Sequence, residues 1–374
     1  MAESADLQHS ARVAPLVDPD RLVLARDLRA LTQQQLVDHA GGKFTPAALS
    51  QLETGKSRPT AATLAAIADA TGMPLDFFVA RPNDAAPDGF FRSLRSTSAR
   101  QRKQQLARAH LLHDFITAVE EHVRLPDVQI PTCEPHLDGT DDDRRNAAED
   151  AAEQVRRAWG LGAGPIPNVI RELERHGIVV VRASTFTQEV DAFSVNFPGR
   201  PIAVLGVDKA VTARSRFDAA HELGHLVLHS GLQPGPKEIE KQAHEFAAAF
   251  LMPRSGIVHA LPSTADWRRL AALKIEWRVS ISALLMRARS LGVMSPARYT
   301  NAMKVMSTRG WRRQEPGDDR LGALEVPVLL GLAVQRLEDA RMTLGQLCEQ
   351  AALPIDEVER LLDITIDKRP AVEI

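Results

Sequence analysis

The sequence predicts an α-rich chain of several domains: a helical N-terminal domain, an α+β domain and a helical C-terminal tail. The 374 residues are 44% hydrophobic, which is enough for two or three cores of ordinary size. Apolar residues recur at intervals of three and four along most of the chain, whereas short β-branched runs occur between residues 178 and 206. Stretches rich in Pro, Asp and Gly separate these regions.

Charge and cysteine content exclude several classes of protein. The 46 Lys and Arg nearly balance the 48 Asp and Glu, so any surface for nucleic acid must be local. Cys133 and Cys348 lie far apart, which argues against a disulfide framework or a thiolate zinc cluster. The N-terminus lacks a signal-peptide pattern, and the longest apolar run, at 326–334, is too short to span a bilayer. We therefore expect a cytoplasmic protein with no membrane partner.

Residues 19–81 are predicted to form the first domain from several short helices. Thr32 is expected to cap the helix that begins after it, and Thr45 with Pro46 to open the next one. Gly55 is expected to end that helix, and Thr60 to cap another. The domain is therefore expected to be all-α.

Residues 82–145 are predicted to be a basic helical connector followed by a linker. Between residues 92 and 108 there is no acidic residue, but there are six basic ones: Arg92, Arg95, Arg100, Arg102, Lys103 and Arg108. These cations either extend a nucleic-acid footprint or solvate a connector helix, and both interpretations stay open. Residues 126–145 are rich in Pro and Asp, which predicts a linker or an exposed loop.

Residues 146–300 are predicted to form the α+β domain. Two helices are expected before three short strands, and further helices at 212–229, at 237–251 and up to residue 292. A helical region, 301–374, follows. In it "MTLGQLCEQA" echoes "LTQQQLVDHA" near the N-terminus, which indicates either a second helix-turn-helix-like unit or two ordinary amphipathic helices.

The stretch "SRFDAAHELGHLVLHS" contains the pattern H-E-x-x-H. Positions four apart lie on one face of a helix, so His221 and His225 can both bind one Zn²⁺ at roughly 2.0–2.1 Å. Glu222 lies next to the metal and can act as general base toward a zinc-bound water. A chance match in a buried helix is the alternative.

A catalytic zinc also needs a third protein ligand, which the following helix can supply. The candidates are His229 on the first helix and four residues on the second, Glu238, Glu240, His244 and Glu245. We choose Glu240 as the ligand, and we expect His244 to support the site by a hydrogen bond to a zinc histidine.

The two segments "RFDAAHELGHLVLH" and "EKQAHEFAAAFLMP" resemble the ImmA/IrrE family of zinc metallopeptidases. The resemblance implies a compact minimal zincin of gluzincin type. It assigns His221, His225 and Glu240 as metal ligands and Glu222 as the catalytic base. One departure is His244, because the family usually has Asn at that position.

The N-terminal domain resembles the XRE, or Cro/repressor-like, helix-turn-helix. The features that carry this resemblance are "LTQ" at residue 31, "SQLETG" at residue 50, Arg58-Pro59 and the helix that follows. The resemblance makes residues 45–53 the helix that enters the major groove of double-stranded DNA. The "GGKF" turn is longer than usual, so the register of that helix is open by one residue. The implied DNA-binding residues are Gln33, Thr45, Pro46, Ala47, Ser50, Gln51, Lys56 and Arg58.

Together the two halves resemble fused regulators of the ImmA/IrrE group from residue 20 to about residue 320. The resemblance implies a DNA-binding transcriptional regulator that acts as a homodimer on an operator. Its zinc-dependent endopeptidase domain would cleave a repressor- or antitoxin-like protein, or its own chain. The alternative is a non-enzymatic regulator whose zincin domain is a sensor or an oligomer scaffold.

Overall fold

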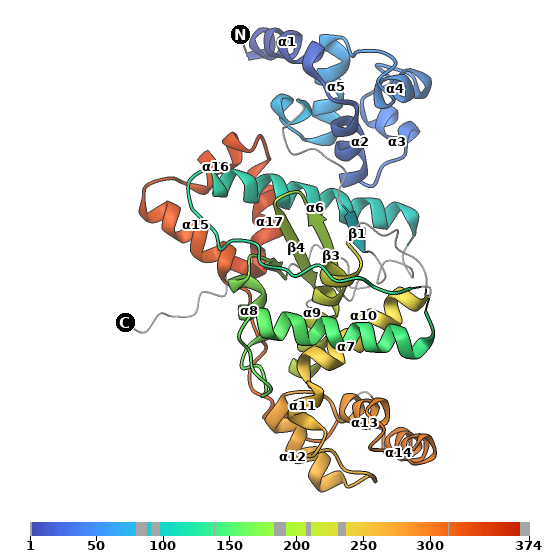
Figure 1. Ribbon diagram of the computed structural model, residues 1–374. Coiled ribbons are helices and arrows are strands. Elements are labelled where there is room, and N and C mark those ends of the chain that lie inside the picture. The colour runs from blue at the N-terminus through green and yellow to red at the C-terminus, as the bar shows by residue number, and fades with distance from the viewer. Residues whose placement is uncertain are drawn as a thin grey trace.

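The computed structural model is elongated and rich in helix, as Figure 1 shows. It describes residues 2–79, 88–90, 98–137, 139–182, 192–206, 211–230, 237–312 and 314–366. The N-terminal helices lie at one end, a small sheet lies in the middle, and helices α11 to α14 lie at the other end (Figure 1). The predicted fold class, a multidomain chain with an all-α N-terminus and an α+β domain, is confirmed.

The N-terminal domain consists of α1 (Ala2–Val13), α2 (Pro19–Leu28), α3 (Gln33–His39), α4 (Pro46–Glu53) and α5 (Ala61–Thr71). Thr32 caps α3 in a reciprocal pair with Gln35, and the hydroxyl of Thr45 accepts the backbone N–H of Ala48 in α4. Helix α4 ends before Gly55, whose φ of 69° suits glycine. Helix α1, which was not predicted, packs on α5.

The connector contains one long helix, α6 (Ala99–Glu120), which crosses the middle of the molecule (Figure 1). It buries an apolar stripe that includes Leu112, Phe115 and Val119. Helix α7 (Asp141–Ala158) then begins five residues before its predicted start, because Thr140 and Asp143 form a capping box. The last residues of the predicted loop therefore belong to this helix.

Among the described residues, four strands form one sheet in the order β1-β3-β4-β2. They are β1 (Asp88–Phe90), β2 (Val179–Val181), β3 (Ala192–Phe197) and β4 (Arg200–Leu205). β1 and β4 each pair with β3 in antiparallel fashion, and β2 pairs with β4 in parallel. The last three match the predicted strands. β1 was not predicted, and it comes from the connector.

The sheet is the middle layer between two sets of helices. Side chains alternate along a strand, so Phe193 and Val195 of β3 join the apolar cluster around α6. Ala192 of β3 and Ala203 of β4 belong instead to the cluster on the opposite face. That face is covered by α9 (Thr212–Leu228), which packs against α8 (Val169–Arg175), α7 and α10 (Lys237–Leu251).

The remaining helices lie at both ends of this layer. Helices α11 (Arg254–Ile257), α12 (Trp267–Trp277), α13 (Ile281–Ser290) and α14 (Pro296–Thr308) form the end opposite the N-terminal domain (Figure 1). Helices α15 (Leu329–Asp339), α16 (Leu344–Gln350) and α17 (Ile355–Ile366) return to pack on α6. In the part of the chain that the structure describes, no helix has the length and apolarity that a membrane span requires.

The sequence echo between the two ends of the chain is also an echo in local structure. Thr343 caps α16 in a reciprocal pair with Gln346, as Thr32 does with the N3 glutamine of α3. Each cap follows a residue of positive φ, Ala30 at 50° and Arg341 at 66°. The connection between α15 and α16 therefore repeats the one that joins α2 to α3.

Candidate metal centre and nucleic-acid interface

The candidate metal centre lies where α9 and α10 pack closely together. Gly224 of α9 faces Phe246 of α10, and a Cβ atom at residue 224 would lie 2.9 Å from the phenyl ring. The glycine therefore permits the close approach of the two helices. That approach brings Glu240, in the first turn of α10, next to His221 and His225.

The spacing of the three side chains fits a tetrahedral metal ion. The Nε2 atoms of His221 and His225 are 3.1 Å apart. Oε2 of Glu240 is 3.4 Å from the first nitrogen and 3.6 Å from the second. Bonds of about 2.0–2.2 Å at tetrahedral angles place ligand atoms about 3.3–3.6 Å apart. Both distances to Glu240 lie in this range, and the distance of 3.1 Å between the imidazole nitrogens lies just below it. Two imidazoles and one carboxylate are also the donor set of many catalytic zinc sites.

The three side chains are buried, with exposed fractions of 7%, 1% and 6% for His221, His225 and Glu240. Burial alone would raise the pKa of Glu240. Hydrogen bonds and charge from the two histidines outweigh it, and they hold the pKa of this carboxyl well below its usual range. Glu240 is therefore a carboxylate at neutral pH, which is the form that binds a cation.

Glu222 is buried beside this cluster and is held from the sheet. Its Oε2 accepts a hydrogen bond of 2.8 Å from Oγ of Ser194. Ser194 lies two residues after Ala192 in β3, so the alternation of the strand points it at α9. No sequence motif marks this serine, and only the alternation of the strand indicates it. Phe90 of β1 is the register partner of Ser194, so this part of the connector is the strand next to the one that carries the serine.

The other two histidines near the centre have different neighbours. His244 is exposed, and its ring lies edge-to-face on His221 with 4.7 Å between centroids. His229 is fully buried, with Nδ1 3.1 Å from Nδ1 of His225 and Nε2 2.9 Å from Oε1 of Gln242. Burial lowers the pKa of His229 to about 4. The geometry thus places His229, one of the candidates for the third ligand, behind His225. No sequence motif marks Gln242, which contacts His229 across the two helices.

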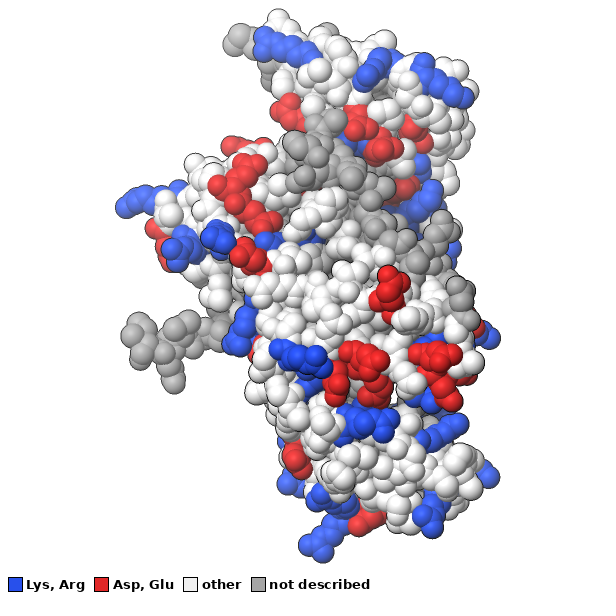
Figure 2. All heavy atoms as spheres, viewed as in Figure 1, with Lys and Arg blue, Asp and Glu red and all other residues white. Residues whose placement is uncertain are grey.

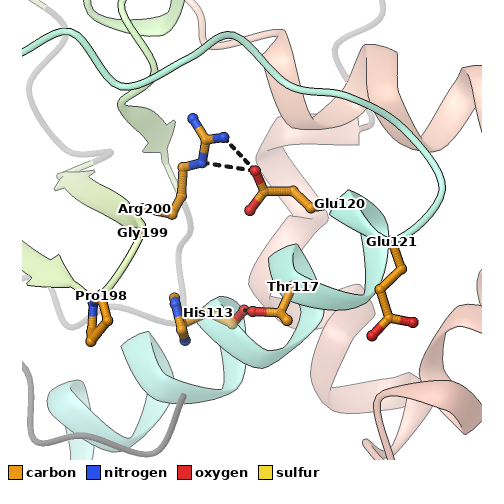
Figure 3. A pocket seen from close by; sticks show the side chains of 7 residues that line it. All are labelled: His113, Thr117, Glu120, Glu121, Pro198, Gly199 and Arg200. Carbon is orange, nitrogen blue, oxygen red and sulfur yellow. Dashed lines mark hydrogen bonds and ion pairs between the residues drawn. The ribbon is translucent and has the colours of Figure 1, made fainter. Parts of the chain in front are cut away.

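A separate hollow of about 350 Å³ lies between α6 and the turn that joins β3 to β4 (Figure 3). Arg200 and Glu120, which both line the hollow, form an ion pair with each other. Arg200 also donates hydrogen bonds to the backbone carbonyls of Pro126 and Gly177. These partners neutralise the guanidinium. In the described residues, a cluster of metal-binding side chains occurs at His221, His225 and Glu240.

Helix α4 presents several of the predicted DNA-binding residues to solvent. Thr45, Ala47 and Gln51 are exposed, Pro46 and Ser50 are half-buried, and all five lie on α4 or at its N-cap. Gln33, at the start of α3, donates a hydrogen bond of 2.8 Å to Glu53 of α4. This bond ties the two helices of the motif together.

The predicted phosphate contacts differ in their surroundings. Lys56 and Arg58 are both exposed in the segment after α4, and Arg58 also donates a hydrogen bond of 2.6 Å to the carbonyl of Val17. In Figure 2 Lys and Arg appear at the outer end of this domain, and acidic side chains appear on the side toward α6.

The basic connector residues are divided between two surroundings. Arg100 donates a hydrogen bond of 3.1 Å to Gln35 of α3, so it lies beside the N-terminal domain. Arg108 is half-buried among charged side chains that include Glu357 of α17. Arg92 and Arg95 lie outside the described residues.

Comparison with known protein families gives two matches in the order that the motifs predict. Residues 22–78 match the helix-turn-helix family, and residues 173–289 match the peptidase family described as IrrE N-terminal-like domain. No curated protein matches the chain. The two matched segments contain α4 and the His221–Glu240 cluster, respectively. In that order, the chain therefore carries a segment that matches the XRE-like helix-turn-helix family and a segment that matches the ImmA/IrrE-like peptidase family.

Proposed function

We propose that this protein is a cytoplasmic transcriptional regulator that binds operator DNA as a homodimer and carries a zinc-dependent endopeptidase. The observation that carries the enzymatic half is the spacing of Glu240 from the two imidazole nitrogens, 3.4 Å and 3.6 Å, with Glu222 beside them. The DNA-binding half is supported by the exposed face of α4. The proposed domains are 19–81, 82–145, 146–300 and 301–374.

The chemistry of the site follows from its side chains. His221, His225 and Glu240 would hold the zinc ion, which when bound polarises a carbonyl and lowers the pKa of water. Glu222 accepts a proton from the attacking water and delivers it to the amide nitrogen that leaves. Ser194 holds one oxygen of that carboxylate, which keeps Glu222 in one orientation while it transfers the proton.

Among the proposed substrates, the chain itself has an observation in its favour. β1 of the connector pairs with β3, and its Phe90 lies opposite Ser194, the residue that holds Glu222. A peptide substrate that adds to a sheet edge also lies extended against the edge strand, and here that strand, β3, carries the serine that holds Glu222. Cleavage near β1 would break the chain between the DNA-binding domain and α6.

Intact-mass measurement of the zinc-loaded protein tests this proposal. We expect two fragments whose masses sum to the full chain plus one water, and no fragments from the Glu222→Gln variant, which keeps the three metal ligands. A repressor- or antitoxin-like protein added to the same reaction tests cleavage in trans. Fragments that form equally in Glu222→Gln would exclude this site as the protease.

The alternative, a non-enzymatic regulator with the zincin as a sensor, also has an observation in its favour. The DNA-binding domain is tied to α6 by a buried ion pair, Arg21–Asp114, so a change in the zincin can reach the operator-binding surface. Operator affinity that changes with zinc, without any cleavage by the wild-type protein, would support this function over proteolysis.

A further inference from the structure

We propose that His229 and Gln242 are positioning residues that fix the tautomer of the metal-binding His225. They form a hydrogen-bond chain that begins at two backbone carbonyls outside α9 and α10 and ends at Nδ1 of His225. The proposal rests on the metal site proposed above, and it concerns residues that neither metal binding nor proton transfer requires directly.

The chain begins at the side-chain amide of Gln242, which is fully buried. Its Nε2 donates to the carbonyl oxygen of Pro135 and, at 3.2 Å, to that of Arg144. Carbonyl oxygens only accept hydrogen bonds, so these two contacts determine which end of the amide is the NH₂ group. Oε1 of Gln242 must then face His229, where it can only accept.

The next member is His229, which is also fully buried. Its Nε2 lies 2.9 Å from Oε1 of Gln242 and therefore carries the proton. In the neutral ring the other nitrogen, Nδ1, is an acceptor, and it lies 3.1 Å from Nδ1 of His225. Nδ1 of His225 is consequently the donor in that hydrogen bond.

With its proton on Nδ1, His225 has a lone pair on Nε2, the atom that faces His221 and Glu240. Two backbone carbonyls thus determine, through a chain of four hydrogen bonds, that the correct nitrogen is available for a cation. These carbonyls belong to the segment before α7 and to its first turn, so the connector supports the metal centre. Loss of such support typically weakens metal binding 10–100-fold.

The tautomers can be measured on the wild-type protein, which avoids any question of folding. Imidazole ¹⁵N chemical shifts and long-range ¹H–¹⁵N correlations distinguish a proton on Nδ1 from one on Nε2. We expect the proton on Nδ1 of His225 and on Nε2 of His229. A His229 ring protonated on Nδ1 would overturn the proposal.

Variants test the consequence for metal binding. Gln242→Met keeps the volume but removes both polar ends, and we expect zinc affinity, measured by competition with a chelator, to fall about 10–100-fold. The visible spectrum of the Co²⁺-loaded variant is expected to differ from that of the wild type. His229→Phe should have a similar effect, and the double variant should lose little more, because both changes break one chain.

The matched control is Asn196→Ala. The side-chain amide of Asn196 donates a hydrogen bond of 2.8 Å to Ser230, next to the end of α9, but it takes no part in the chain from Gln242 to His225. The zinc affinity of this variant is therefore expected to stay within about threefold of the wild-type value. Wild-type affinity in folded Gln242→Met would overturn the positioning role. Absence of zinc binding in the wild-type protein would instead overturn the proposed metal site itself.

Discussion

Replacing Asp114 by Ala tests whether the DNA-binding domain is rigidly joined to the rest of the molecule. Asp114 of α6 pairs with Arg21 of α2 through two hydrogen bonds, of 2.5 Å and 3.1 Å. The Arg21 side chain is 2% exposed, and its guanidinium lies 5.3 Å from the ring centroid of Phe77. Removing the carboxylate therefore takes this ion-pair partner from a buried guanidinium.

Truncating one partner of a buried pair typically costs about 3–5 kcal/mol, whereas apolar replacement of both partners is often neutral or stabilising. We expect Asp114→Ala to lower the free energy of unfolding by about 3–5 kcal/mol. Arg21→Met combined with Asp114→Leu should restore most of that loss. The coupling of the two sites is read from a double-mutant cycle.

Urea unfolding, monitored by circular dichroism, measures these free energies. Operator binding by the same variants shows whether the DNA-binding domain has lost its fixed position on α6. A loss below about 1 kcal/mol in Asp114→Ala would refute the reasoning, since that is the value expected of an exposed pair. A double variant as unstable as the sum of its single variants would refute it equally.

Three further changes test other parts of the structure. Gly256→Ala places a Cβ 1.9 Å from the carbonyl oxygen of Ala163, so we expect the free energy of unfolding, measured by thermal unfolding, to fall by an amount near the upper end of about 1–3 kcal/mol. Gly164→Ala, whose Cβ meets nothing within 4 Å, is the control, and equal losses in the two variants would contradict the prediction. Burial lowers the pKa of His113, so the stability it contributes is complete above its unfolded pKa of about 6.5 and is lost as the pH falls through the folded value. His113→Asn should reduce the change of melting temperature between pH 7.5 and pH 5. A change with pH equal to that of the wild type would count against this. Lys56→Ala should weaken operator binding and reduce the salt slope by about 1 without changing sequence preference, which a binding-site selection would check.

The helix motif could be predicted because its geometry is local. His221 and His225 share a face through the period of the helix alone, and Glu222 follows from the same spacing. The partner glutamate was one of several candidates, because the register of α10 against α9 depends on tertiary packing. Gly224 and Phe246 set that register, and the sequence does not show that they meet.

Residues that support the site from other elements were beyond prediction for the same reason. Ser194 contacts Glu222 only because β3 packs on α9, and Gln242 reaches Pro135 only because an irregular segment lies against α10. β1 is another such case. Its three residues carry no periodicity, and their strand conformation comes from pairing with β3.

The C-terminal unit shows how a repeated local pattern can serve a different role. A helix that reads DNA needs an exposed N-terminal turn, and acidic residues there repel phosphates. The first turn of α17 carries Asp356 and Glu357. Glu357 is buried and pairs with Arg29, which directly follows α2 of the DNA-binding domain. The connection between α15 and α16 repeats the α2–α3 connection of the DNA-binding domain. Helix α17, in contrast, uses its first turn for a buried contact with Arg29 and helps to hold the DNA-binding domain in place.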